Sequence, residues 1–236
     1  MFATYFVEIC TGGTEDILAV KDLPIDRIEL NRGLELGGLT PELPLLAFAK
    51  SQLNVPVICM VRPRTAGFVY SETEYELMKE NAKLLLTHGA DGIVFGFLKE
   101  DRTIDANRTR EFTSLIHSYG KEAVFHRAFD ETIDPYSSIE ILIDSQVDRL
   151  LTSGLQPTAL EGASLIRSLN EQYGSAISIL PGAGINENTV SSVLTETGAH
   201  QFHMSAKVIS HDRGDYIAVS KQNIQAVKHR LESMNQ

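Results

Sequence analysis

The chain of 236 residues contains only two cysteines, Cys10 and Cys59, and no tryptophan. Two cysteines cannot form the disulfide framework of a small secreted domain, so we expect a reducing, cytoplasmic location. No apolar run is long enough to cross a bilayer, and residues 1–4 do not resemble a secretory signal. The sequence therefore predicts a protein that neither spans nor binds a membrane.

An excess of basic residues is also missing. The 21 lysines and arginines face 31 aspartates and glutamates, which gives a net charge of −10 and argues against a nucleic-acid partner. A local arginine cluster could still hold a small anionic ligand, and Arg62, Arg64 and Arg127 follow strand-like runs. The alternative is that these arginines pair with nearby acidic residues.

What the chain does contain is a regular alternation of short apolar runs and helix-length segments, without a linker or a break in composition. Parallel strands joined by helices explain this spacing, and eight of them in a chain of this length predict one domain, a (β/α)8 TIM barrel spanning residues 1–236. The runs are Phe6–Cys10, Arg27–Asn31, Val57–Val61, Gly92–Phe95, Glu122–His126, Arg149–Thr152, Ile177–Leu180 and Gln201–Met204.

Helix signals lie between the runs. Thr40-Pro41 and Asp134-Pro135 are typical of helix starts, and Ser71–Glu74 and Thr158–Glu161 fit capping boxes. The last helix is expected over about Tyr216–Ser233, after a polar loop at Ser210–Asp215. Glycines that precede strands predict helix ends at Gly89, Gly120, Gly174 and Gly198.

Two carboxylates stand inside apolar runs. Strand side chains alternate between the two faces of a sheet, so Glu8 and Glu29 are candidates for the barrel interior on neighbouring strands. A buried carboxylate needs a partner or a raised pKa. The two glutamates are therefore either structural ion-pair partners of an inward arginine such as Arg62 or Arg127, or an acid/base pair.

His126 closes the fifth run, where a barrel strand presents residues to its C-terminal mouth. Its imidazole could transfer protons near neutral pH, and Asp130 could orient the ring. His203, near the end of the eighth run, is a second candidate of the same kind.

Small residues follow the last three runs. Many barrels bind phosphate through backbone N–H groups after strands seven and eight, which makes Gly182, Gly184 and Ser205 candidates for anion binding. Ser153 and Gly154, after the sixth run, could add donors. The alternative for the glycine pair is a tight turn that binds nothing.

Metal-ligand motifs are sparse. Cys59 should face outward if Arg62 faces inward, which leaves Cys10 as the thiol ligand, with Met204 as the one other soft side chain near it. The sequence contains neither a CxxC nor an HExxH motif.

Several motifs, taken together and in order, resemble the CutC family from the first strand to about residue 206. They are Glu8-Ile9-Cys10, Arg27-Ile28-Glu29-Leu30, Gly37-Gly38-Leu39-Thr40-Pro41, Arg62-Pro63-Arg64, Phe125-His126-Arg127-Ala128-Phe129-Asp130, Leu151-Thr152-Ser153-Gly154 and His203-Met204-Ser205-Ala206.

The resemblance implies a cytoplasmic TIM-barrel protein of copper homeostasis, with copper(I) bound by cysteines at the ends of the first two strands. The first of these cysteines matches Cys10, whereas the second position holds Asn31. Our first hypothesis is thus a CutC-like protein with at most a weak copper(I) site at Cys10. The second is an enzyme that acts on a small anionic or phosphorylated metabolite by general acid/base chemistry. A homo-oligomer is compatible with either hypothesis.

Overall fold

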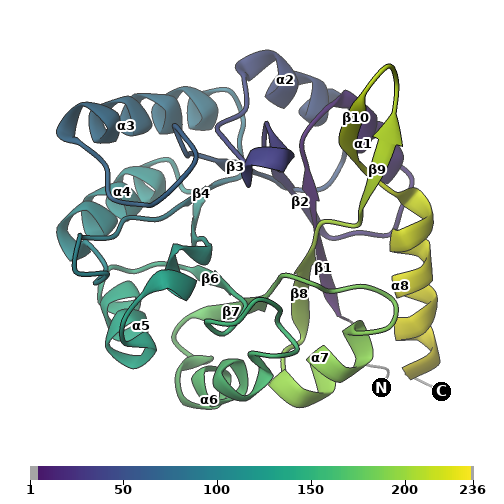
Figure 1. The fold of residues 1–236 in the computed structure, drawn as a ribbon. Coiled ribbons are helices and arrows are strands. Elements are labelled where there is room, and N and C mark those ends of the chain that lie inside the picture. Colours follow the sequence, from purple (N-terminus) through teal and green to yellow (C-terminus); the bar gives the residue numbers. More distant parts are fainter. Residues whose placement is uncertain (1–4, 235–236) are drawn as a thin grey trace.

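The computed structural model describes residues 5–234 and confirms the predicted (β/α)8 barrel (Figure 1). Eight parallel strands are hydrogen-bonded in the order β7-β6-β5-β4-β3-β2-β1-β8. The side-chain amide of Gln201 bridges β8 to β7 by donating to the carbonyl of Ile179 at 2.9 Å. The strands are β1 (Phe6–Thr11), β2 (Arg27–Leu30), β3 (Val57–Met60), β4 (Gly92–Phe95), β5 (Glu122–Phe125), β6 (Arg149–Thr152), β7 (Ser178–Pro181) and β8 (Gln201–Met204).

Helices surround the barrel, and none among the described residues is long and apolar enough to span a membrane. The α-helices are α1 (Thr14–Val20), α2 (Leu43–Gln52), α3 (Glu72–Thr87), α4 (Ala106–Ser118), α5 (Pro135–Asp144), α6 (Ala163–Tyr173), α7 (Val190–Thr197) and α8 (Lys221–Met234). Two short 3₁₀ helices, η1 (Leu34–Leu36) and η2 (Arg127–Glu131), lie in the loops.

Most of the predicted helix boundaries are confirmed. Ser71 and Glu74 form a reciprocal capping box at the start of α3, and the Asp134 carboxylate caps α5 by accepting from backbone N–H groups. Gly89, Gly120 and Gly198 follow helices with a positive φ.

Two boundary predictions were wrong. Helix α2 begins at Leu43 and not at the predicted cap, Thr40, whose hydroxyl instead donates to the carbonyl of Arg62 at 3.1 Å. Thr158 and Glu161 do exchange hydrogen bonds, but they form a turn ahead of α6. Gly174 does end α6 as predicted, although its φ of −61° means that no left-handed conformation requires glycine there.

The largest correction concerns the segment after β8. The predicted polar loop and the start of the predicted last helix form an antiparallel hairpin, β9 (Lys207–His211) and β10 (Asp215–Val219), and α8 begins only at Lys221. The hairpin stands outside the barrel, where β10 packs against α1 (Figure 1). The Asp16 carboxylate joins the two elements by accepting from the backbone N–H of Val219 at 2.8 Å.

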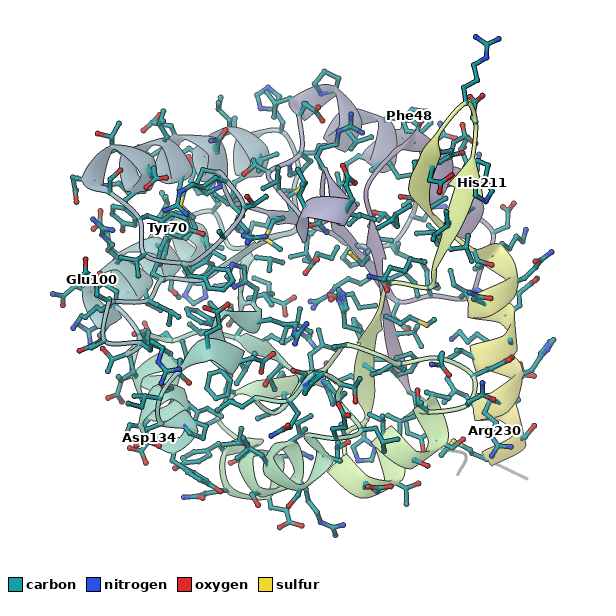
Figure 2. All side chains as sticks on the ribbon, viewed as in Figure 1. Phe48, Tyr70, Glu100, Asp134, His211 and Arg230 are labelled. Carbon is teal, nitrogen blue, oxygen red and sulfur yellow. The ribbon has the colours of Figure 1, made fainter. Side chains whose placement is uncertain are left out.

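Side chains fill the centre of the barrel as well as the space between strands and helices (Figure 2), as strand alternation requires. A small apolar cluster, which contains Ile58, Met60, Val94 and Val124, is separate from the large core formed with the helices. Cys59 belongs to the large core, which confirms its predicted outward direction. Met204 also packs there, so its thioether faces out of the barrel, away from the interior side to which Cys10 points.

Candidate functional site

A cavity of about 190 Å³ lies at the C-terminal mouth of the barrel. It is lined by Cys10, Glu29, Asn31, Leu34, Gly37, Gly38, Met60, Arg62, Phe68, His126, Arg127, Leu151, His203, Ser205 and Lys207. A larger hollow of about 590 Å³ lies beside the hairpin, but neither cysteine nor histidine lines it. The smaller cavity is the candidate site, because thiol, imidazole and carboxylate groups meet there.

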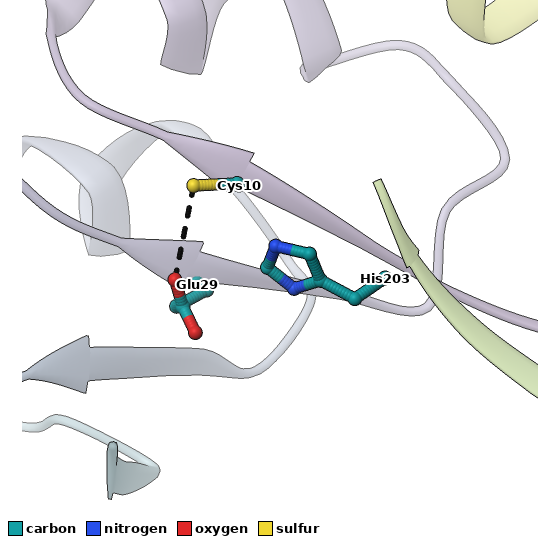
Figure 3. A group of neighbouring side chains, drawn as sticks. All are labelled: Cys10, Glu29 and His203. Atoms are coloured by element: carbon teal, nitrogen blue, oxygen red, sulfur yellow. Dashed lines mark hydrogen bonds between the residues drawn. The ribbon is translucent and has the colours of Figure 1, made fainter. Parts of the chain in front are cut away.

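Three potential metal ligands converge in this mouth cavity (Figure 3). One ligand atom each from Cys10, Glu29 and His203 lies within 4.8 Å of the other two. The register of β1 against β2 pairs Cys10 with Glu29, and the thiol donates to the carboxylate over a Sγ–Oε1 distance of 3.7 Å. The barrel fold therefore places a soft sulfur, an imidazole and a carboxylate around one point.

Asn31 holds two of these groups in place. Its side-chain amide donates to Glu29 Oε1 at 2.8 Å and to Cys10 Sγ at 3.4 Å. This position also explains Gly38, because an added Cβ there would lie 2.5 Å from Asn31 Oδ1. The residue that stands in place of a second cysteine thus contacts the thiol without supplying a second sulfur.

The floor of the site is a buried charge network. Glu8, 1% exposed, forms an ion pair with Arg27. Its other oxygen is hydrogen-bonded to His203 Nδ1 at 2.6 Å. Arg27 also forms an ion pair with Glu122, and Glu122 pairs in turn with Arg149 at 2.8 Å. Because Glu8 engages Nδ1, Nε2 is the ring nitrogen of His203 that is left for a metal.

This network corrects the expected partner of the two glutamates. Glu8 and Glu29 do face the interior, but neither pairs with Arg62 or Arg127; the partner of Glu8 is Arg27. Arg27 precedes Glu29 by two residues, so alternation alone could have identified it as an inward side chain. That Arg27 pairs with Glu8 depends on the register of β1 with β2, which places these two residues side by side.

The environment shifts the pKa values of the three potential ligands. Burial, and then the charges of Glu29 and Glu8, raise the pKa of the Cys10 thiol well above its usual range. Burial also raises the pKa of Glu29, against the opposing effect of His203. For His203 burial lowers the pKa, but Glu29 and Glu8 outweigh it and raise the value overall. The site therefore holds protons that a cation would have to displace.

Glu8 differs from Glu29 although both are buried. Burial is the largest single influence and raises its pKa, but Arg27 and His203 together lower the pKa to about 2. Glu8 is thus a permanent anion that orients His203 and neutralises Arg27, and it lies beneath the cavity lining.

The other wall of the mouth cavity consists of Arg62, Phe68 and His126. Arg62 Nη1 donates to the carbonyls of Leu36, Gly37 and Gly38 at 3.2 to 3.3 Å. The Phe68 ring lies 5.2 Å from the Arg62 guanidinium carbon and 4.8 Å from the His126 ring centroid. Arg62 therefore fixes the Gly37-Gly38 loop and not the glutamates.

His126 is a neutral, buried imidazole. Burial, helped by the charge of Arg62, lowers its pKa to about 3. Its Nδ1 accepts the backbone N–H of Ala128 at 3.1 Å, so Asp130 does not orient the ring as expected. The ring packs over Gly96, where a Cβ would lie 2.4 Å from the imidazole carbon Cε1.

Asp130 instead organises the loop after β6. Its carboxylate accepts from Thr152 Oγ1 at 2.5 Å, from the Ser153 and Leu155 backbone, and from Arg127 Nε at 2.8 Å. Ser153 and Gly154 are held within this loop and do not line the cavity.

Two further expected anion contacts also lie elsewhere. Arg64 is 41% exposed and pairs with Glu74 over the Tyr70 ring. Gly182 and Gly184 follow β7 but are absent from the cavity lining, whereas Ser205 and Lys207 are part of it. Of the expected arginines, Arg62 and Arg127 reach the cavity and Arg64 does not.

Comparison with known proteins matches this architecture to one family. The model of the CutC family covers residues 5–208. A CutC family protein from Treponema denticola is 46% identical over 200 residues, 85% of this chain and 80% of that protein. The human copper homeostasis protein cutC homolog is 38% identical over 203 residues, 86% of this chain and 74% of that protein.

Solved structures agree with the sequence comparison. The putative copper homeostasis protein CutC from Streptococcus agalactiae superposes with a TM-score of 0.80 at 27% identity, covering 86% of this chain and 99% of that one. Phosphoribosylanthranilate isomerase from Pyrococcus furiosus, at a TM-score of 0.58 and 14% identity, shares the fold alone. The family model, the relatives and a solved structure each match most of the chain, and the chain therefore belongs to the CutC family.

Proposed function

We propose that this protein acts in copper homeostasis and binds one copper(I) ion through the thiolate of Cys10 and Nε2 of His203. The names of its relatives support the process, and the convergence of Cys10, Glu29 and His203 within 4.8 Å supports the site. Copper(I) favours soft ligands, and imidazole is also a suitable copper ligand.

Glu29 has a different role in this proposal. A carboxylate is a hard ligand and binds copper(I) poorly, but Glu29 Oε1 lies 3.7 Å from Cys10 Sγ and can accept the proton that leaves the thiol. Asn31, which donates to the same sulfur, stabilises the thiolate once it forms. One sulfur instead of two makes this a weaker site than a pair of cysteines would form.

The state of the cysteines and the lining of the cavity also bear on where the protein acts and on the alternative activity. We propose a cytoplasmic protein, because both cysteines are free and buried. An enzyme for phosphorylated metabolites draws less support, since Arg64 and the Gly182–Gly184 segment do not line the cavity.

Titration of the protein with copper(I) under anaerobic, reducing conditions tests the proposal, with a chromophoric copper(I) chelator as competitor. Wild type should take one ion from the chelator, and Cys10→Ser should not. Cys59→Ser is the matched control, because Cys59 is also a free, buried thiol but packs in the outer core. Equal copper binding by wild type and Cys10→Ser would refute the site.

A further inference from the structure

The mouth cavity is lined by residues with polar atoms that the copper proposal does not use. Four buried side-chain atoms of these residues have no hydrogen-bond partner: Arg62 Nε, His126 Nε2, Glu29 Oε2 and Asn31 Oδ1. Their residues are at most 8% exposed. Buried polar atoms are nearly always hydrogen-bonded in native proteins, so four orphans around one cavity indicate a polar ligand.

One wall supplies donors and a positive charge. The Arg62 guanidinium donates to backbone carbonyls and lies near the Tyr70 hydroxyl, and no carboxylate of residues 5–234 pairs with it. His126 accepts at Nδ1 and is neutral, so its remaining proton is on Nε2, which is a donor. An uncompensated guanidinium next to a neutral imidazole donor favours an anion with one negative charge.

The other wall presents Glu29 Oε2 and Asn31 Oδ1. A hydroxyl group suits this wall, because it both donates and accepts and so pairs with Glu29 in either protonation state. A phosphate dianion suits it poorly, because two negative charges would meet one buried cation and a neighbouring carboxyl. The other cations of the lining are Arg127, which is paired with Asp130, and the exposed Lys207. The volume of about 190 Å³ is below the roughly 300–1,000 Å³ of pockets for drug-sized molecules and restricts the ligand to a few carbons.

We propose that the mouth cavity binds a small hydroxycarboxylate, whose carboxylate accepts from Arg62 Nε and His126 Nε2 and whose hydroxyl contacts Glu29 and Asn31. Phe68, which packs on both donors, and Leu34 supply the apolar contact for its carbon atoms. This inference does not depend on copper, because its two charge-binding donors, which follow β3 and β5, are not ligands in the copper proposal.

The test uses the full chain, free of metal, so that copper binding does not enter the result. Glycolate and L-lactate are the probes, with acetate as the analogue that lacks the hydroxyl and inorganic phosphate as the competing anion. Calorimetric titration should show saturable binding of at least one hydroxycarboxylate, about tenfold tighter than acetate and than phosphate.

Arg62→Gln should weaken that binding about tenfold or more, because a charged hydrogen bond is lost. The matched control is Arg64→Gln, which removes a neighbouring arginine outside the cavity and should leave the affinity unchanged. Equal binding by Arg62→Gln and wild type, or saturable binding of phosphate alone, would overturn the proposal. So would the failure of both hydroxycarboxylates to bind at millimolar concentration.

A second measurement on wild type covers the case in which Arg62→Gln does not fold. The ring nitrogens of His126 can be followed by NMR with labelled histidine during addition of glycolate. The resonance of Nε2 should shift until the protein is saturated with glycolate. The resonance of Nδ1, which accepts a hydrogen bond from the Ala128 backbone N–H, should change little. An Nε2 resonance that does not move would equally overturn the proposal.

Discussion

The Glu8→Gln substitution should destabilise the protein by about 3 kcal/mol at pH 7. Glu8 is buried, carries a negative charge and has Arg27 and His203 as partners. Glutamine has nearly the same shape and can keep one hydrogen bond, so the change mainly removes the charge. Arg27 would retain only Glu122, and the positive charge of the network would be incompletely balanced.

The magnitude follows from the pKa of Glu8. The value falls from 4.5 to about 2 on folding, and 1.36 kcal/mol per unit gives about 3 kcal/mol. Because the folded pKa is the lower one, this stability is fully present above pH 4.5 and is lost as the pH falls through 2. The difference between wild type and Glu8→Gln should therefore shrink to about 1 kcal/mol at pH 3.

Urea denaturation of both proteins between pH 3 and pH 7 measures this difference. Glu29→Gln is the matched control, because the pKa of Glu29 is raised by burial and its linkage has the opposite sign. Ionised Glu29 opposes folding at neutral pH, so Glu29→Gln should cost little there. A Glu8→Gln penalty below about 1 kcal/mol at pH 7, or one that grows toward pH 3, would refute the reasoning.

Three further results are expected. Asp130→Ala should lower the free energy of unfolding by about 2–4 kcal/mol in urea titrations, because several buried donors lose their acceptor; a loss under 1 kcal/mol would contradict this. Gly38→Ala should lower the melting temperature more than Gly120→Ala. Both glycines have a positive φ (+87° and +67°), but only at Gly38 would the added Cβ meet another side chain, that of Asn31. Equal melting temperatures would show that this contact is unimportant. The apparent copper(I) affinity should rise about tenfold per pH unit between pH 6 and 8, since the raised pKa of Cys10 requires proton displacement; competition titrations showing a flat profile would contradict thiolate ligation.

Strand prediction succeeded because each strand is a short buried run that ends in polar residues. Alternation within the strands also placed Glu8, Glu29 and Cys10 inside the barrel and Cys59 outside. These are properties of one strand at a time, and a single sequence contains them.

The ion-pair and hydrogen-bond partners of these side chains could not be predicted in the same way. That Glu8 pairs with Arg27, and that His203 reaches both Glu8 and Glu29, depends on the registers of β1 with β2 and with β8. Arg62 was expected at the mouth, but the fold of residues 32–39 decides that its guanidinium meets carbonyls there.

The hairpin did have a signal in the sequence. Two stretches rich in β-branched residues, at 207–211 and 215–219, flank Asp212-Arg213-Gly214, which is a turn pattern. The expectation of an outer helix after the eighth strand outweighed this pattern. The true helix, α8, begins two residues after the hairpin ends.

The most direct test of the copper site is a crystal of the protein loaded anaerobically with copper(I), measured above and below the copper absorption edge. We predict one anomalous peak within bonding distance of Cys10 Sγ and of His203 Nε2, with Nδ1 of the same ring still hydrogen-bonded to Glu8. A peak at another place on the molecule, or none near Cys10 in crystals shown to contain copper, would contradict it.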